Sequence, residues 1–269
     1  MPFGLTNTPA TFKRFMNDIF SDMVDVCVVI YLNDILICSN NIDEHHTHVW
    51  EVLRHLRKHG LYARVPKCTF HTDTVKYLGY ILSPTGLTMD SAKVQVIQNW
   101  PEPRKVKNIQ SFLGFANFYH RFIHEYSDIV IMLTQLIWKD LKWNFSNACH
   151  NTFNNLKPAF TSAPVLTHWI PDAPMIVKTD ASNYAIAAIF SIILPNGEIH
   201  PVAFHSCTLT TSKLNYDTHD KELLAILKAF QKWQHYSVHH VLGTTHLLGT
   251  VHIVTSKHIQ SLRKKLSMF

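Results

Sequence analysis

The chain lacks the sequence features that mark several classes of protein. Its five cysteines, Cys27, Cys38, Cys68, Cys149 and Cys207, are odd in number and scattered, which indicates reduced thiols in an intracellular protein of the cytoplasm or nucleus. No cysteine pair has the spacing of a structural zinc site. No apolar run reaches the roughly 20 residues of a membrane span, and no signal peptide opens the chain. A soluble protein without structural metal is therefore expected.

Charge is limited but unequal in sign. The chain has 25 Lys and Arg against 19 Asp and Glu, a formal net charge of +6 and a pI near 9.0. This excess favours polyanionic partners, but it is too mild to prove nucleic-acid binding. At 269 residues and 46% hydrophobic content, the chain can bury the core of one large domain or two ordinary ones.

Helical periodicity is clearest in four segments. Thr8 is a candidate N-cap before Pro9, and apolar residues then recur at three- and four-residue steps to Met23. A second helix is predicted over 43–59, with Gly60 as its stop. A third contains Ile109, Phe112, Leu113 and Ala116 at helical spacing, and a fourth is predicted to bury Leu223, Ile226, Leu227 and Phe230.

Between these helices, short runs rich in β-branched residues predict strands. The stretch YLNDILI places Asn33 and Asp34 inside an apolar run, so we predict a hairpin of two buried strands with its turn at these residues. Asn-Gly at 196–197 predicts a second turn, between strands of the C-terminal half. Helices alternating with strands in this way indicate an α/β (α+β) fold.

A carboxylate on a tight hairpin can position a metal ion, although an ordinary Asn-Asp turn explains the same residues. The surrounding sequence motifs favour the interpretation as a metal-binding position. MPFGLTNTPATF, YLNDILI, VKYLGYILSPTGL and WPEPRKVKNIQSFLGFANFYHRFI, in this order, closely resemble the reverse transcriptase of gypsy-type LTR retrotransposons. TSAPVL, KTDAS and NYDTHDKELLAILKAFQKW resemble the tether and ribonuclease H domain of the same polyproteins.

The resemblance implies a polymerase site at the hairpin. The family's tip is Tyr-x-Asp-Asp, whereas this chain has Tyr31-Leu32-Asn33-Asp34. Such polymerases use two Mg²⁺ ions held by three carboxylates. Asn33 and Asp34 take the positions of two of these, but only Asp34 offers a negative charge to a metal. Losing one charge beside divalent ions costs roughly several kcal/mol, which slows turnover roughly a thousandfold or more.

The resemblance also implies a truncated polymerase domain. The family's third carboxylate lies in a motif N-terminal to MPFGL, and this chain begins at Met1 within that motif. We therefore expect a partial palm with thumb and connection, and no fingers. Residues expected by resemblance to contact the nucleotide or the primer are Phe3, Gly4, Tyr31, Leu78 and Gly79, although core packing is as good an explanation for Phe3 and Leu78.

In the C-terminal half, Asp180 and Glu222 match the first two metal-binding acids of the ribonuclease H family. Taken alone, Asp180 is better explained as a strand-end turn residue and Glu222 as a charge that complements the helix dipole. The flanking motifs TDAS and KELLAI favour the metal-binding role. The family's third acid is expected in a motif similar to V-T-D-H, where this chain has Val254-Thr255-Ser256-Lys257. The resemblance thus implies weakened Mg²⁺ binding, in a mixed sheet with helices that is truncated at its C-terminus.

We expect a palm and thumb remnant over 1–99, a connection over 100–172 and a ribonuclease H-like domain over 173–269. By resemblance, the partners are RNA/DNA template-primer and RNA-DNA hybrid. The lineage is that of an RNA-directed DNA polymerase with ribonuclease H, and we expect impaired catalysis. Two alternatives are a non-catalytic remnant that binds nucleic acid or a partner protein, and a decaying element copy without a selected role.

Overall fold

A computed structural model describes residues 6–138, 143–171, 173–242 and 252–255. The chain divides into two compact units, residues 1–84 and 85–269. The division at residues 99 and 172 expected from the family is different, and it stays a prediction. The two units are described separately below.

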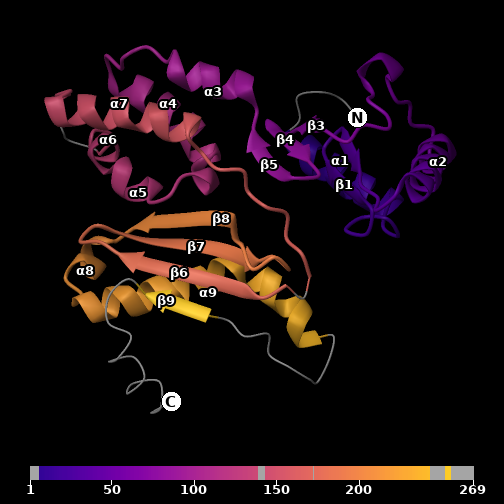
Figure 1. Ribbon diagram of the computed structural model, residues 1–269. Coiled ribbons are helices and arrows are strands. Elements are labelled where there is room, and N and C mark those ends of the chain that lie inside the picture. Colours follow the sequence, from indigo (N-terminus) through magenta and orange to yellow (C-terminus); the bar gives the residue numbers. More distant parts are fainter. Residues whose placement is uncertain (1–5, 139–142, 172, 243–251, 256–269) are drawn as a thin grey trace. The chain divides into compact units, whose positions relative to one another are not determined.

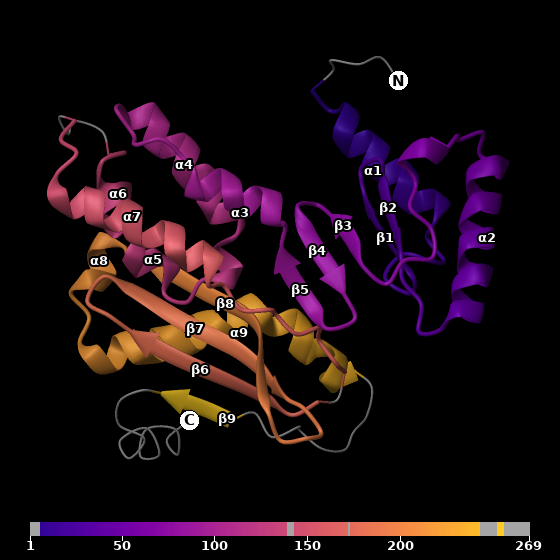
Figure 2. The same ribbon diagram turned by 45° about the horizontal axis from the view of Figure 1, so that its top comes forward.

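The first unit is built around a short β-hairpin and two helices. Helix α1 packs against β1, and α2 packs against β2 (Figure 2). Their contact is an apolar cluster that includes Phe20, Met23, Val28 and Leu56, all less than 10% exposed. The elements in chain order are α1 (Thr8–Ile19), β1 (Val28–Tyr31), β2 (Asp34–Ile37), α2 (Ile42–Lys58), the 3₁₀ turn η1 (Val65–Lys67), β3 (Val75–Tyr77) and β4 (Tyr80–Ser83).

Both helices of this unit are confirmed, with small corrections at their ends. Thr8 is the first residue of α1 and not its N-cap, since Asn7 holds that position without a side-chain hydrogen bond. Helix α2 begins with a reciprocal cap, in which the Asn41 side chain accepts from the Glu44 backbone N–H at 2.8 Å and donates to the Glu44 carboxylate at 2.7 Å. Gly60, with φ +67°, follows its end.

The second unit contains a helical part followed by a sheet. Strand β5 (Gly86–Met89) forms an isolated bridge from Leu87 to Leu166. The helical part comprises α3 (Ser91–Gln98), α4 (Val106–Phe118), η2 (His120–Phe122), α5 (Tyr126–Ile129), α6 (Ile131–Gln135) and α7 (Asn147–Thr161). The four apolar residues predicted on one face of α4 are all buried, and Phe112 meets Phe153 of α7 with ring centroids 4.7 Å apart.

The sheet of the second unit has four strands in the order β8-β7-β6-β9. Strands β6 (Met175–Ala181), β7 (Ala185–Ile193) and β8 (Ile199–Thr208) form an antiparallel meander. The turn between β7 and β8 contains Gly197 with φ +84°, which confirms the predicted Asn-Gly turn. After α8 (Thr211–Leu214) and the long α9 (Thr218–Leu242), β9 (His252–Thr255) returns parallel to β6.

Helix α9 crosses one face of this sheet (Figure 1). Its buried side is made of Ala225, Ala229 and Trp233, and the last two pack on Val177 of β6 and its neighbours. The predicted buried face was wrong in part, because Leu223 and Leu227 are 51% and 52% exposed. Small alanines allow the helix to approach the strands closely, so the larger leucines lie on the side away from the sheet.

The other face of the sheet meets the helical part of the same unit. The backbone N–H of Ser127 donates to the Ser206 hydroxyl at 2.9 Å, and the Ser182 hydroxyl donates to the Asp128 carboxylate at 2.7 Å. The His124 and Phe204 rings meet edge to face. The sheet is thus covered on both faces, by α9 on one side and by the η2–α5 region on the other.

Candidate functional site

The hairpin tip is the first candidate site. Tyr31 pairs with Asp34, so the turn consists of Leu32 and Asn33, and Asp34 is the first residue of β2. The turn is therefore one residue earlier than predicted. Leu32 takes a left-handed φ of +53°, a conformation that usually costs a non-glycine residue roughly 1 kcal/mol or more.

The strands of this hairpin are less buried than predicted, since β1 alternates between buried and exposed residues and β2 has no buried residue. In β1, Val28 and Ile30 are buried, whereas Val29 and Tyr31 are 44% and 50% exposed. The side chains of Asn33 and Asp34 are exposed. The hairpin therefore presents an amide and one carboxylate to solvent on a strand pair that is anchored in the core.

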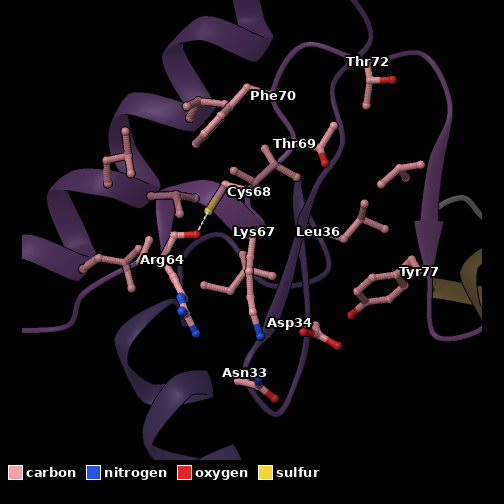
Figure 3. Close-up of a pocket in the computed structure, with 18 of the residues that line it drawn as sticks. Asn33, Asp34, Leu36, Arg64, Lys67, Cys68, Thr69, Phe70, Thr72 and Tyr77 are labelled. Atoms are coloured by element: carbon pink, nitrogen blue, oxygen red, sulfur yellow. Dashed lines mark hydrogen bonds between the residues drawn. The ribbon is translucent and has the colours of Figure 1, made fainter.

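Three residues absent from the sequence prediction lie around this tip. Figure 3 shows the Lys67 ammonium and the Arg64 guanidinium extending toward the end of a pocket where Asn33 and Asp34 lie, with the Tyr77 ring on the Asp34 side. Burial and the nearby Asp34 carboxylate raise the pKa of the Tyr77 phenol, whose hydroxyl donates to the Val29 carbonyl at 3.4 Å.

The predicted primer-grip residues form the turn of a second hairpin. Tyr77 pairs with Tyr80, so Leu78 and Gly79 are its two turn residues, and both have positive φ, +51° and +82°. Positive φ at both central positions is the pattern of a type I′ turn. Leu78 also lines the pocket beside the first hairpin. Primer contact by this turn stays a prediction.

The second candidate site lies in the sheet of the C-terminal half. Asp180 is the penultimate residue of β6, and Glu222 is in the first turns of α9, where it is only 8% exposed. Ala225, one turn further along α9, belongs to an apolar cluster against which Ala181 packs. The two acids therefore come from the same end of the sheet.

Strand alternation separates these acids by face. Val177 packs in the cluster formed with α9, and Asp180, three positions later, is on the opposite face of β6. The Glu222 carboxylate has no hydrogen bond or ion pair within the described parts of the chain. Sharing of one ion by the two carboxylates stays a prediction, and it requires Glu222 to reach around the end of the strand.

The region expected to hold the third acid is described only up to Thr255. Strand β9 lies beside β6, and Thr255 pairs with Thr179, the residue before Asp180. The end of β9 therefore lies beside the strand that carries Asp180, and the assignment of the third-acid motif to this segment stays a prediction. Ser256 and Lys257 lie outside the described residues, as do Phe3 and Gly4 of the predicted nucleotide contacts.

Neither candidate site forms a complete metal centre from the described residues. Within these ranges, no group of three or more His, Cys, Asp or Glu side chains could hold a metal ion. Among the helices that the structure describes, none is long and apolar enough to cross a membrane. The hairpin tip offers a metal one carboxylate beside two cationic side chains, a ligand set that does not fit a pair of divalent ions.

Comparisons with known proteins assign a family to each of the two parts of the chain that contain these residues. Residues 1–82 match the family described as reverse transcriptase (RNA-dependent DNA polymerase), and residues 145–242 match the RNase H-like domain found in reverse transcriptase. The transposon Tf2-3 and Tf2-7 polyproteins of Schizosaccharomyces pombe are 34% identical over 236 residues, which are 88% of this chain and 18% of each relative. The chain therefore spans less than a fifth of these relatives' length.

Solved structures show the same fold. The foamy viral protease-reverse transcriptase in complex with an RNA/DNA hybrid superposes with a TM-score of 0.78 and 24% identity, covering 98% of this chain and 34% of that one. Its complex with double-stranded DNA gives a TM-score of 0.77, also at 24% identity, over 98% of this chain and 53% of that chain. This chain belongs to the reverse transcriptase and ribonuclease H-like region of gypsy-type LTR retrotransposon polyproteins.

Proposed function

We propose that this chain binds RNA/DNA template-primer and hybrid duplexes, and that its polymerase site turns nucleotides over far more slowly than a site with the family's two adjacent aspartates. The net charge of +6 favours a polyanionic partner. The foamy viral relative in fold is described in complex with RNA/DNA hybrid and with double-stranded DNA. Binding through a shared fold is compatible with lost chemistry, because phosphate contacts do not require the catalytic carboxylates.

The proposed slow turnover of nucleotides rests on Asn33. Reverse transcriptases and ribonucleases H use divalent metal ions, and Mg²⁺ prefers carboxylate oxygens. At the tip, Asn33 contributes a neutral oxygen beside Asp34, while the cationic side chains of Lys67 and Arg64 extend toward the same end of the pocket. Each of these differences lowers the local affinity for Mg²⁺ through the Coulomb energy.

The ribonuclease H-like half supports at most weak metal binding. Asp180 and Glu222 supply two carboxylates, and the third position of the motif is Ser256 followed by Lys257 in the sequence. A serine hydroxyl brings no charge to Mg²⁺, and a lysine beside the site repels it. Asp180 and Glu222 would hold one ion, which supplies Lewis-acid stabilisation of a phosphodiester when bound.

Filter binding of an RNA-DNA hybrid at graded salt tests the binding half. For a chain that binds the hybrid, the logarithm of the binding constant falls steeply and linearly with the logarithm of the salt concentration, because phosphate contacts release counterions. A chain that retains no hybrid even at low salt would instead support the interpretation as a decaying element copy.

Primer extension on an RNA template with Mg²⁺ tests the catalytic half. We expect no incorporation of labelled nucleotide above a no-enzyme blank. Incorporation that disappears in Asp34→Ala would show that Asn33 is an adequate ligand and would contradict the proposal.

A further inference from the structure

The pocket beside the hairpin tip has the wrong charge for the metal chemistry of its family. It has a volume of about 580 Å³ and lies within the first unit, lined by β2, the segment from η1 to β3, and parts of α1 and α2 (Figure 3). Among its described lining residues, Asp34 is the one carboxylate, and Arg64, Lys67 and Lys76 are cationic. Three positive charges against one negative charge leave a balance of +2 with the histidines neutral.

Two of these cations are unpaired among the described residues. Within those ranges, the side chains of Arg64 and Lys67 form no hydrogen bond or ion pair. Both residues are exposed, and both extend toward the tip. Unpaired guanidinium and ammonium groups that converge on one cavity are the groups that bind phosphate in proteins.

Asn33 completes this arrangement. An aspartate at this position would compensate one of the cations and would attract a metal ion. The amide leaves the positive charge uncompensated and adds an N–H donor that a phosphate oxygen can accept from. The same substitution that weakens the tip as a metal site therefore strengthens it as an anion site.

We propose that this pocket binds a phosphate ester through Lys67, Arg64 and the Asn33 amide without a divalent metal ion. The inference rests on the proposed nucleic-acid binding and specifies where one phosphate is held. Nucleic-acid backbone and free polyphosphate share this chemistry. In either case, the two cations stand in for the charge that metal ions supply in a carboxylate site.

Titration of the whole chain with inorganic pyrophosphate in EDTA, followed by backbone amide NMR shifts, tests the proposal. We expect shifts at residues of the tip and of η1 in the absence of any divalent ion. Lys67→Gln should weaken pyrophosphate binding about fivefold, the effect of one charge at short range in water. Lys58→Gln is the matched control, since Lys58 is exposed on α2 and does not line the pocket, and it should leave the affinity unchanged.

Charge substitutions at the tip distinguish an anion site from a metal site, because the two kinds of site respond in opposite directions. Asn33→Asp should weaken pyrophosphate binding and Asp34→Asn should strengthen it, each by about fivefold. Binding that appears only with Mg²⁺, or that Asn33→Asp strengthens, would overturn the proposal, because a metal site responds with the opposite sign. Unchanged amide spectra of these variants outside the pocket would confirm that they fold.

The source of the phosphate is decided by competition with labelled RNA-DNA hybrid, also in EDTA. Displacement of the hybrid by pyrophosphate, together with weaker hybrid binding in Lys67→Gln, indicates a backbone phosphate. Pyrophosphate binding without displacement indicates a free polyphosphate. If the hybrid binds with normal salt dependence while pyrophosphate shifts no pocket residue, the pocket assignment fails and the proposed function stands. If the hybrid does not bind at any salt, the proposed function itself fails.

Discussion

Replacing Gly86 by alanine should destabilise the second unit strongly. Gly86 opens β5 with φ +141°, a conformation that residues with a side chain rarely adopt. A Cβ atom there would lie 2.3 Å from the Leu166 carbonyl oxygen and 2.9 Å from Cγ1 of Val165. The first of these is a backbone atom, so no side-chain rotation can relieve the overlap.

The magnitude follows from what must move. Separating the two segments breaks the hydrogen bonds from Leu87 N–H to the Leu166 carbonyl (2.7 Å) and from Leu166 N–H to the Leu87 carbonyl (2.9 Å). Two such bonds contribute about 1 to 3 kcal/mol, and the disfavoured φ adds about 1 to 3 kcal/mol. We therefore expect Gly86→Ala to lower the free energy of unfolding by about 2 to 6 kcal/mol.

Urea unfolding followed by circular dichroism measures this loss. The matched control is Gly114→Ala, because Gly114 lies in α4 and a Cβ atom added there would meet nothing within 4 Å. At that position, alanine should stabilise the helix by about 0.5 to 1 kcal/mol. A Gly86→Ala variant that unfolds within about 0.5 kcal/mol of the parent would refute the reasoning.

Three further outcomes follow from the sites. Asn33→Asp should raise the affinity for Mn²⁺ about tenfold in a titration followed by electron paramagnetic resonance, because it adds a charge next to Asp34. Cleavage of an RNA-DNA hybrid should be undetectable with Mg²⁺ and at most trace with Mn²⁺, which binds oxygen ligands more tightly, and Glu222→Gln should remove any trace. Burial, aided by the charge of Lys232, lowers the pKa of His205 to about 4. Because the unfolded chain binds this proton near pH 6.5, the contribution of His205 to stability should be constant above that pH and fall toward pH 4. The full shift corresponds to roughly 3 kcal/mol, and solvent screening of the partly exposed ring reduces the expected loss to about 2 kcal/mol. His205→Leu should remove this slope in urea unfolding.

Each of these outcomes has a contrary result. An Asn33→Asp variant with unchanged Mn²⁺ affinity would show that the tip is not a metal position at all. Robust Mg²⁺-dependent cleavage that Glu222→Gln abolishes would reveal a substitute for the third acid. A His205→Leu variant with the parent's pH dependence would show that His205 is not the group responsible for it.

The sequence predicts those elements whose local pattern and packing agree. The spacing of Ile109, Phe112, Leu113 and Ala116 predicts α4 and its buried face, because these apolar residues form one stripe along the helix and that stripe packs against the core. In α9 the same rule selects the wrong residues in part. The helix packs close to the sheet, and only small side chains fit between them. Ala225 and Ala229 are therefore buried there, whereas Leu223 and Leu227 are exposed.

The sites show a similar limit. Asp34, Asp180 and Glu222 are predicted from the motifs around them, since each motif is contiguous in the chain. Lys67 is not part of such a motif. It belongs to η1, which is distant from the hairpin in sequence, and only the folded structure brings it beside the tip. The turn is displaced by one residue because Leu32 accepts a left-handed φ that turn statistics assign to glycine or asparagine.

The hydrogen bonds between α5 and the sheet have a consequence for dissecting the protein. Ser127 and Asp128 bond to Ser206 and Ser182, across the boundary at residue 172 that family resemblance suggests. An expression fragment beginning at residue 173 would keep the sheet and α9 but would leave Phe204 and its neighbours uncovered on the opposite face. Such a fragment should aggregate more readily than one beginning at residue 85, because the solvent-exposed apolar strand surface is available for intermolecular association.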